Sequence, residues 1–595
     1  ALNDLLYLDA TTAEHLELFS TKSSLASSHH LFEVLDKTMT SMGSRQLRRW
    51  MQCPLKDIKK IRVRQDAIEE LVEKVDTRKK LRDILKGVYD MERLITRIAS
   101  QRSNARDLIA LRTSLHHVLQ VGREMNNLDS LLLSEVKLNL EVDQDFLKLM
   151  DQMLCEDPPF SVREGGMFNP GVSRELDEYR LAKTNGKQWL SALEAKERQT
   201  TGISTLKIRY NRVFGYFLEV TKGQISKVPS SYERRQTLTN AERYITPELK
   251  EYESKILSAE EKIQQIEYDL FEHLREQVMG KRGAIGQIAK GLSTLDVLLS
   301  LAEVADQNAY TRPVVSENQI LDIQDGRHPI VEAFVRTEAF VPNSLKLNAD
   351  TRLVILTGPN MAGKSTIMRQ MALIIYMAQL GSFVPATAAH IGVVDRIFTR
   401  VGASDDLSRG RSTFMVEMNE AANILRNATK NSFVVLDEIG RGTSTYDGLA
   451  IAWAVAEDLH DRIQCKAIFA THYHELTELA AKKPAIHNLN VAIKEWQGEL
   501  IFIRKLAEGA VSRSYGIEVA KMAGVPHQVV ERAKSVMKAF ENVEAVPVNE
   551  DAKQIPTPKA SQEEWLEDLF KVDCHTMTPL EAINLISIWQ KRYKK

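Results

Sequence analysis

The sequence predicts a multidomain protein with an all-helical part containing long coiled helices, a small β-rich insertion, an α/β part with a phosphate-binding loop, and a C-terminal helix-turn-helix and helical tail. Three observations support this fold class. Apolar residues recur three and four positions apart through residues 31–152. One long helix is expected over residues 246–279, with a heptad pattern from Leu249 to Leu270. After about residue 320, short β-rich runs alternate with helical segments.

The composition limits the class of protein. A chain of 595 residues is too long for one core and favours about four globular units. The net charge of −1 says nothing about nucleic acid, so any DNA surface must come from local charge asymmetry. The four cysteines lie far apart and form no Cys-x-x-Cys pair, which suits a reducing cytoplasm and predicts no zinc site.

No segment has the features of a membrane anchor or a secretion signal. The most apolar window, residues 371–386, is shorter than the roughly 20 residues that a spanning helix needs, and we expect a buried helix there. Residues 1–19 carry acidic side chains, no apolar signal core and no initiator Met. We therefore expect a fragment or a processed product.

A long helix and a partner helix form a predicted arm. Thr246 is a good N-cap and Pro247 suits the first helical position. About 35 residues at 1.5 Å each would extend roughly 50 Å, and residues 175–198 are the expected partner helix. The heptad seam consists of Leu249, Tyr252, Ile256, Ala259, Ile263, Ile266 and Leu270.

Between the two arm helices lies a basic segment, residues 204–243, which we call the arm tip. Residues 206–210 alternate apolar and basic side chains, which predicts a strand, and a second strand follows at residues 216–220. The arm tip holds eight Lys or Arg against three Glu, with aromatic residues between them. This pattern favours sequence-independent, salt-sensitive contact with duplex DNA over a merely solvated hairpin. The predicted contacts are Lys207, Arg209, Arg212, Lys222, Lys227, Arg234 and Arg235.

A complete P-loop, residues 358–365, lies between an apolar strand, residues 353–357, and a helix. Its glycines let backbone N–H groups converge on phosphates. Lys364 would reach the β and γ phosphates of ATP, and Ser365 would offer its hydroxyl to Mg²⁺. Further strands are expected at residues 397–401, 433–436 and 467–470.

Two carboxylates end the strand of residues 433–436. An acidic pair in this place is often only a solvated turn, but the upstream P-loop favours function. Asp437 would hold Mg²⁺ through water, and Glu438 would orient or deprotonate the attacking water. His472 follows another strand end, where it could face the γ-phosphate or serve a structural role.

Three segments, residues 357–366, 437–448 and 470–476, together resemble the MutS family. The resemblance implies an ABC-type ATPase that works as a dimer, with residues 408–418 as a signature motif and Ser412 contacting the partner's γ-phosphate in trans. It implies that Phe340 stacks on adenine and that residues 440–447 cross the dimer interface. The phosphate-contacting residues would be Gly358, Pro359, Asn360, Met361, Ala362, Gly363, Lys364, Ser365 and Thr366. Ala362 stands where many relatives have glycine, and we expect its added methyl group near the phosphates to be tolerated.

The resemblance extends upstream, where residues 207–217 and 234–244 look like the clamp that grips duplex DNA. It begins clearly near Leu31, so we expect the family's mismatch-reading domain and nearly all of its connector domain to be missing. The expected domains are a helical core and lever (1–171), a clamp arm (172–248), a second lever part (249–317), an ABC-type ATPase (318–510), a helix-turn-helix dimer contact (511–541), a linker (542–563) and a helical tail (564–595).

The resemblance implies a DNA mismatch-repair ATPase of the cytoplasm, associated with the nucleoid. Its expected partners are duplex DNA, a second copy of the chain, a MutL-type repair protein and the replication sliding clamp, with tetramers formed through the tail. Two alternatives stay open. One is a MutS-like protein that binds recombination junctions, and the other is a DNA-bridging ABC-type ATPase without mismatch recognition.

Overall fold

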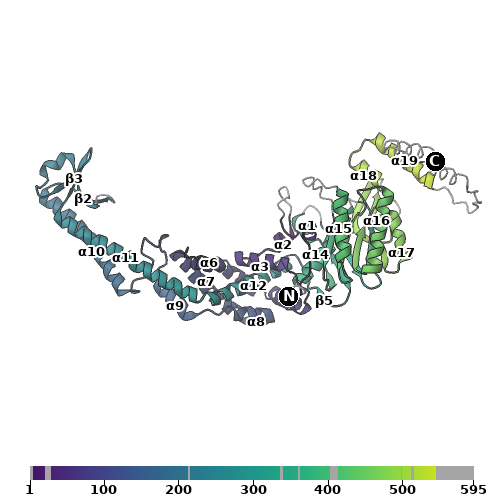
Figure 1. The fold of residues 1–595 in the computed structure, drawn as a ribbon, viewed down its shortest axis with the longest axis horizontal. Coiled ribbons are helices and arrows are strands. Elements are labelled where there is room, and N and C mark those ends of the chain that lie inside the picture. The colour runs from purple at the N-terminus through teal and green to yellow at the C-terminus, as the bar shows by residue number, and fades with distance from the viewer. Residues whose placement is uncertain are drawn as a thin grey trace, which may run out of the picture. The chain divides into compact units, whose positions relative to one another are not determined.

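The computed structural model describes residues 4–20, 29–211, 215–335, 339–359, 362–401, 413–496, 499–510 and 515–544 (Figure 1). The chain divides into two compact units, Ala1–Ser514 and Tyr515–Lys595. The first unit contains the helical part, the arm and the α/β part. None of the helices in the described ranges is long and apolar enough to cross a membrane.

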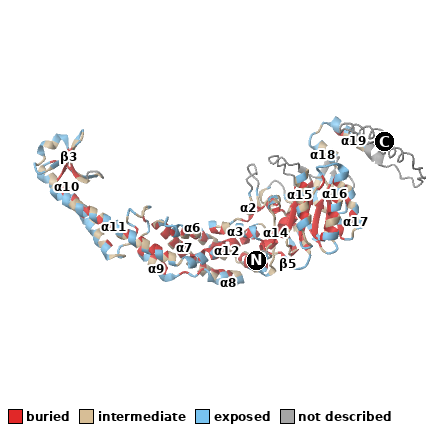
Figure 2. Cartoon of the chain, in the orientation of Figure 1, coloured by how far each residue is buried: buried red, intermediate tan, exposed pale blue. Residues whose placement is uncertain are grey.

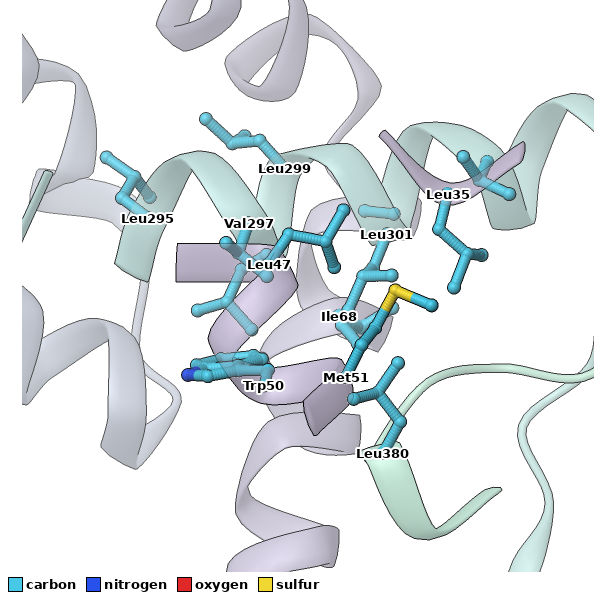
Figure 3. Packing of buried hydrophobic residues seen from close by; sticks show 14 of the residues in the cluster. Leu35, Leu47, Trp50, Met51, Ile68, Leu295, Val297, Leu299, Leu301 and Leu380 are labelled. Atoms are coloured by element: carbon cyan, nitrogen blue, oxygen red, sulfur yellow. The ribbon is translucent and has the colours of Figure 1, made fainter. Parts of the chain in front are cut away.

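The helical part packs around α12 (Arg282–Gln307). Figure 3 shows Val297 of α12 beside Leu47 of α3, and Leu301 near Met51 of α3 and Ile68 of α4. This agrees with the helical periodicity of residues 31–152. The surrounding helices are α2 (Leu31–Leu35), α3 (Ser41–Gln52), α4 (Ile58–Glu73), α5 (Val75–Leu85), α6 (Met91–Ala99), α7 (Ala105–Glu124), α8 (Leu131–Leu138) and α9 (Gln144–Met153).

The arm consists of α10 (Arg174–Thr201) and α11 (Pro247–Gly280), which lie side by side. As predicted, the Thr246 side chain accepts a hydrogen bond from Leu249 N, and Pro247 occupies the first turn. Trp189 of α10 stacks on Tyr252 with ring centroids 3.4 Å apart. The heptad seam is largely buried, with Leu249, Ile256, Ala259 and Ile263 inside.

The arm tip is a four-stranded antiparallel sheet in the order β1-β2-β4-β3. Both strands expected from the sequence are present. Strands β3 and β4 were not expected; β3 is almost wholly exposed and has no apolar alternation that could reveal it. The strands are β1 (Lys207–Asn211), β2 (Gly215–Thr221), β3 (Glu233–Thr237) and β4 (Ala241–Ile245).

The α/β part contains a six-stranded sheet in the order β10-β11-β12-β8-β13-β14. The first five strands run parallel, and β14 is antiparallel to β13. The central strands are fully buried, as the red ribbons of Figure 2 show. The strands are β8 (Leu353–Thr357), β10 (Ile397–Arg400), β11 (Phe433–Asp437), β12 (Lys466–Ala470), β13 (Ile486–Trp496) and β14 (Glu499–Glu508).

A second sheet has the order β5-β9-β6-β7. Its strands are β5 (Val314–Ser316), β6 (Leu321–Gly326), β7 (Asn343–Leu347) and β9 (Ala388–Gly392). The helices of the α/β part are α13 (Pro329–Phe334), α14 (Lys364–Leu380), α15 (Thr413–Asn427), α16 (Thr445–Asp458) and α17 (Leu479–Lys482).

The apolar window of residues 371–386 is only partly helical. Helix α14 is buried but ends at Leu380, because Gly381 takes a left-handed conformation with φ of 85° and stops it. The residues beyond it form an irregular buried segment that leads to β9. The expectation of a helix through residue 386 was therefore wrong by six residues.

The N-terminal residues belong to the α/β part by their contacts. Tyr7 forms a parallel bridge with Arg396, and α1 (Ala10–His15) packs on β10. His15 Nδ1 lies 2.9 Å from Thr399 O. This segment therefore covers the edge of the six-stranded sheet.

The second unit holds α18 (Gly516–Met522) and α19 (His527–Glu544), joined by a turn in which Gly524 has φ of 85°. The predicted pair of helices around a turn is thus present. Helix α19 continues through Glu544, so the linker expected from residue 542 does not begin there. The rest of the expected linker and the tail lie outside the described residues.

Burial of His328 predicts a loss of stability in acid. Its Nδ1 accepts a hydrogen bond from Val331 N at 3.3 Å, which caps α13. Burial, and next the nearby charge of Arg369, lower the pKa of His328 to about 3. The unfolded imidazole has a pKa of about 6.5 and so takes up protons more readily. The stabilisation of the folded protein by neutral His328 is therefore fully present above about pH 6.5 and is lost as the pH falls toward 3.

We expect the free energy of unfolding to fall by about 2–3 kcal/mol from this residue between about pH 6.5 and pH 4.5. His328→Asn keeps a side-chain cap for α13 but cannot titrate, so it should lose less stability over the same interval. Urea denaturation of both proteins at the two pH values measures the difference. Parallel losses in the two proteins would contradict this account of His328.

Candidate nucleotide site and basic arm tip

The predicted P-loop joins β8 to α14 at the carboxyl edge of the parallel sheet. Gly358 and Gly363 have φ of 131° and 93°, a conformation that favours glycine at both positions. Ala362 N donates to Pro359 O at 3.0 Å. Ala362 itself is fully buried among core side chains, so its methyl group packs into the protein. Asn360 and Met361 lie outside the described residues.

Lys364 is the first residue of α14, and its side chain is buried. Its Nζ donates to Gly358 O at 2.5 Å and lies 3.5 Å from Glu438 Oε1. Burial lowers the pKa of Lys364, while the charges of Glu438 and Asp437 oppose that shift. The ammonium group therefore faces the two carboxylates expected to act with it.

Ser365 and Asp437, predicted from distant parts of the sequence, are in direct contact. Ser365 Oγ donates to Asp437 Oδ2 at 2.6 Å. Burial raises the pKa of Asp437, and the hydrogen bond from Ser365 acts in the opposite direction. A hydroxyl and a carboxylate suit Mg²⁺, which prefers oxygen ligands. In the described part of the chain, no three His, Cys, Asp or Glu side chains form a metal cage, so an ion here would rely on these two groups and on phosphate oxygens.

Strand order explains how His472 comes near the same site. Strand β12 lies between β8 and β11, so its carboxyl end separates the P-loop from the acidic pair. His472 keeps an exposed surface but is partly desolvated, which lowers its pKa; the charge of Glu438 opposes that shift, and the charge of Lys364 adds to it. Glu438 has φ of 53°, and its N donates to Ala470 O at 2.9 Å. The spacing of these residues along the sequence does not reveal the order of the strands in the sheet.

Phe340 lines a pocket of about 290 Å³ beside the P-loop. Gly363 and Thr366 border the same pocket, so it opens next to the expected phosphate position. Sequence reasoning missed the other walls. They come from α13 and the residue after it, the segment around Phe340, and β7, α14 and β14: Val331, Val335, Ala339, Val341, Asn343, Ile367 and Arg504. A planar ring between apolar walls is a fitting occupant. The expected trans residue Ser412 lies outside the described residues, directly before α15.

The predicted DNA contacts do not share one face of the arm tip. Lys207 and Arg209 of β1 pair with Glu219 and Phe217 of β2, and Glu219 also pairs with Arg243. Directly paired residues point to the same side of a sheet, so these side chains form one face. We call it the basic face.

Arg243 belongs to the basic face, although it was absent from the predicted contacts. Its guanidinium lies 4.3 Å from the centroid of the Phe217 ring, and Nη1 donates to Gln236 Oε1 at 2.8 Å. Its Nε and that of Arg209 lie 3.6 Å and 3.3 Å from Glu219 carboxylate oxygens. Glu219 thus holds two arginines side by side. Only the strand register reveals that Arg243 lies opposite Glu219.

The other predicted contacts are placed differently. Arg234 pairs with Tyr244, on the opposite face, and lies 3.6 Å from Glu242. Arg235 falls at a β-bulge, 3.7 Å from Glu233. Lys222 and Lys227 are exposed on the 3₁₀ segment Lys222–Lys227 after β2. Arg212 lies outside the described residues.

Two models of known protein families match this chain. A model described as MutS domain III matches residues 11–302, and one described as MutS domain V matches residues 354–541. The first match begins about twenty residues before Leu31, where the sequence first showed the resemblance clearly.

Relatives named DNA mismatch repair protein MutS align with almost all of this chain. The protein of Ruminiclostridium cellulolyticum is 47% identical over 100% of this chain and 70% of its own length. Those of Acetivibrio thermocellus and Methanothrix thermoacetophila are 46% and 45% identical, over 100% and 99% of this chain and 70% of each relative. The chain belongs to the MutS family of DNA mismatch repair proteins.

Proposed function

We propose that this chain is a DNA mismatch-repair ATPase of the ABC type that binds ATP with Mg²⁺ and hydrolyses it to ADP and phosphate. The observation that carries the proposal is the meeting of Lys364, Ser365, Asp437 and Glu438 at one sheet edge. These residues come from two segments about seventy positions apart, and together they supply a cation, two oxygen ligands and a base.

Each side chain has a role that follows from its position. Lys364 neutralises the β and γ phosphates, and its present contacts with Gly358 O and Glu438 give way to phosphate oxygens. Ser365 would hold Mg²⁺ by its hydroxyl and Asp437 through water, and the ion would supply positive charge beside the transferring phosphoryl group. Glu438 orients or deprotonates water, and His472 faces the γ-phosphate. Phe340 stacks on the adenine ring.

The same proposal extends to assembly. Two chains pair through residues 440–447 and the helix-turn-helix of residues 511–541, so that Ser412 of one chain contacts the nucleotide of the other. Tail residues 564–595 support tetramers. By family resemblance, the proposal also includes the domain divisions expected from the sequence. It includes a MutL-type partner, the replication sliding clamp and action at the nucleoid in the cytoplasm.

The basic face of the arm tip is the proposed contact with duplex DNA. Lys207, Arg209 and Arg243 lie on one face, and Lys222 and Lys227 lie on the adjoining segment. Arg209 on this face, and Arg234 on the opposite face, have exposed guanidinium groups in their pairs with glutamates. Phosphates can therefore compete for these arginines, in a contact without sequence preference.

Glu438→Gln tests the catalytic assignment. We expect ATP binding to persist while turnover falls by about 10² or more, because the amide cannot accept the proton of water. Binding of a fluorescent ATP analogue and steady-state phosphate release measure the two effects. Glu478→Gln, an exposed carboxylate that pairs with Lys482, is the matched control and should turn over normally. Equal turnover in the wild type and Glu438→Gln would remove Glu438 from the mechanism.

A double change, Lys207→Ala with Arg209→Ala, tests the basic face. Binding of plain duplex DNA should weaken for every sequence, and the slope of log K against log salt should become shallower by about 0.9 for each lost phosphate contact. Fluorescence anisotropy over a salt series measures both. Lys255→Ala, on the arm but outside the tip, should leave affinity and slope unchanged. An unaltered slope in the double variant would exclude these residues as phosphate contacts.

A further inference from the structure

The loop that follows Glu438 is held from two sides by buried side chains. One is Glu417 on α15, whose Oε1 accepts a hydrogen bond from Gly440 N at 2.5 Å. Glu417 is 5% exposed. Its other oxygen, Oε2, lies 3.7 Å from Arg400 Nη2. A buried carboxylate with a cationic partner is a strong acceptor for a backbone N–H, so Glu417 fixes one side of this peptide.

Tyr473 holds the other side of the same residue. Its hydroxyl donates to Gly440 O at 3.0 Å, and its own backbone N donates to Thr471 Oγ1 at 3.0 Å. Thr471 N in turn donates to Leu356 O, at the end of β8. The carbonyl of Gly440 is thus connected to the strand that leads into the P-loop.

The backbone conformation at Gly440 requires a glycine. Its φ is 94°, and a Cβ at this position would lie 2.5 Å from Gly448 O. No other residue type fits there without moving the start of α16. Both polar groups and the dihedral angles of Gly440 are therefore set by surrounding structure.

Glu438 lies two residues before this fixed point. Its own N is bonded to Ala470 O at 2.9 Å, and its φ of 53° is unusual for a residue with a side chain. The turn from Glu438 to Gly440 is therefore anchored at both ends. Releasing the Gly440 end would allow Glu438 to return to an ordinary conformation and to aim its carboxylate elsewhere.

We propose that Glu417 is a positioning residue for ATP hydrolysis, which holds the Glu438 turn through Gly440 N, with Tyr473 as its counterpart on Gly440 O. The inference rests on the proposed ATPase function. Glu417 does not touch the reacting atoms. Its effect falls on the rate of the chemical step and leaves the affinity for ATP unchanged, because the adenine pocket and Lys364 are built by other elements.

The test compares Glu417→Leu with Glu417→Gln. Leucine leaves Gly440 N buried without its acceptor, and we expect kcat to fall about 10- to 100-fold with little change in the binding of a fluorescent ATP analogue. Glutamine keeps an oxygen acceptor and should restore most of the turnover. Glu420→Gln is the matched control, because Glu420 also pairs with Arg400, at 2.9 Å, but makes no bond to the loop.

Tyr473→Phe provides a second test that keeps the ring and removes only the hydroxyl, so it serves if Glu417→Leu does not fold. It should lower kcat by a smaller factor, again with unchanged ATP affinity. Normal kcat in both Tyr473→Phe and Glu417→Leu, or no recovery in Glu417→Gln, would overturn the positioning role while leaving the wild-type ATPase intact. Absence of turnover by the wild-type protein would overturn the proposed function and this inference together.

Discussion

Buried hydrogen bonds fix the carboxyl-terminal end of α14 to the helical part of the chain, and the nucleotide site lies at the other end of the same helix. Tyr376 Oη donates to Met51 O at 2.5 Å, and Gln379 Nε2 donates to Leu55 O at 2.9 Å. Both side chains are fully buried, so losing either bond would leave a polar group without water or a partner. Helix α14 is therefore bonded directly to α3 and to the segment after it.

The packing continues from α3 toward the arm. Helix α3 packs on α12, and α12 follows α11 directly after Lys281. At the base of the arm, the buried Glu267 of α11 accepts hydrogen bonds from Arg180 Nη2 and Met167 N, each at 2.8 Å. Coupling between two sites requires a structural element whose conformational equilibrium is shifted by both ligands. In the proposed function that element is the chain of packed helices from α14 to α11, with ATP acting at one end and DNA at the other.

Much of this arrangement could be predicted because it depends on local chemistry. Thr246 and Pro247 mark a helix start by capping, and the P-loop glycines mark a strand-to-helix turn by their dihedral freedom. The heptad seam predicted the partner helix of the arm. Phe340 was expected only through family resemblance, since a single aromatic residue has no pattern of its own.

The parts that escaped prediction depend on register and strand order. Nothing in the sequence places β12 between β8 and β11, and yet this order brings Thr471 and His472 to the P-loop. Strand β4 was not expected from the sequence, so its pairing with β2, which brings Arg243 onto the basic face, was not predicted. The bond from Gly440 to Glu417 spans 23 positions and follows no periodicity. Such contacts arise from tertiary packing, which single-sequence patterns do not encode.

In the proposed function, DNA at the arm tip and ATP at the sheet edge act on one another. Steady-state ATP hydrolysis by the purified chain, with and without plain duplex DNA and at low and high salt, tests it most directly. We expect DNA to change the rate of hydrolysis at low salt and high salt to abolish that change, because phosphate contacts weaken as salt rises. ATP turnover that does not respond to DNA at either salt concentration would contradict the coupling.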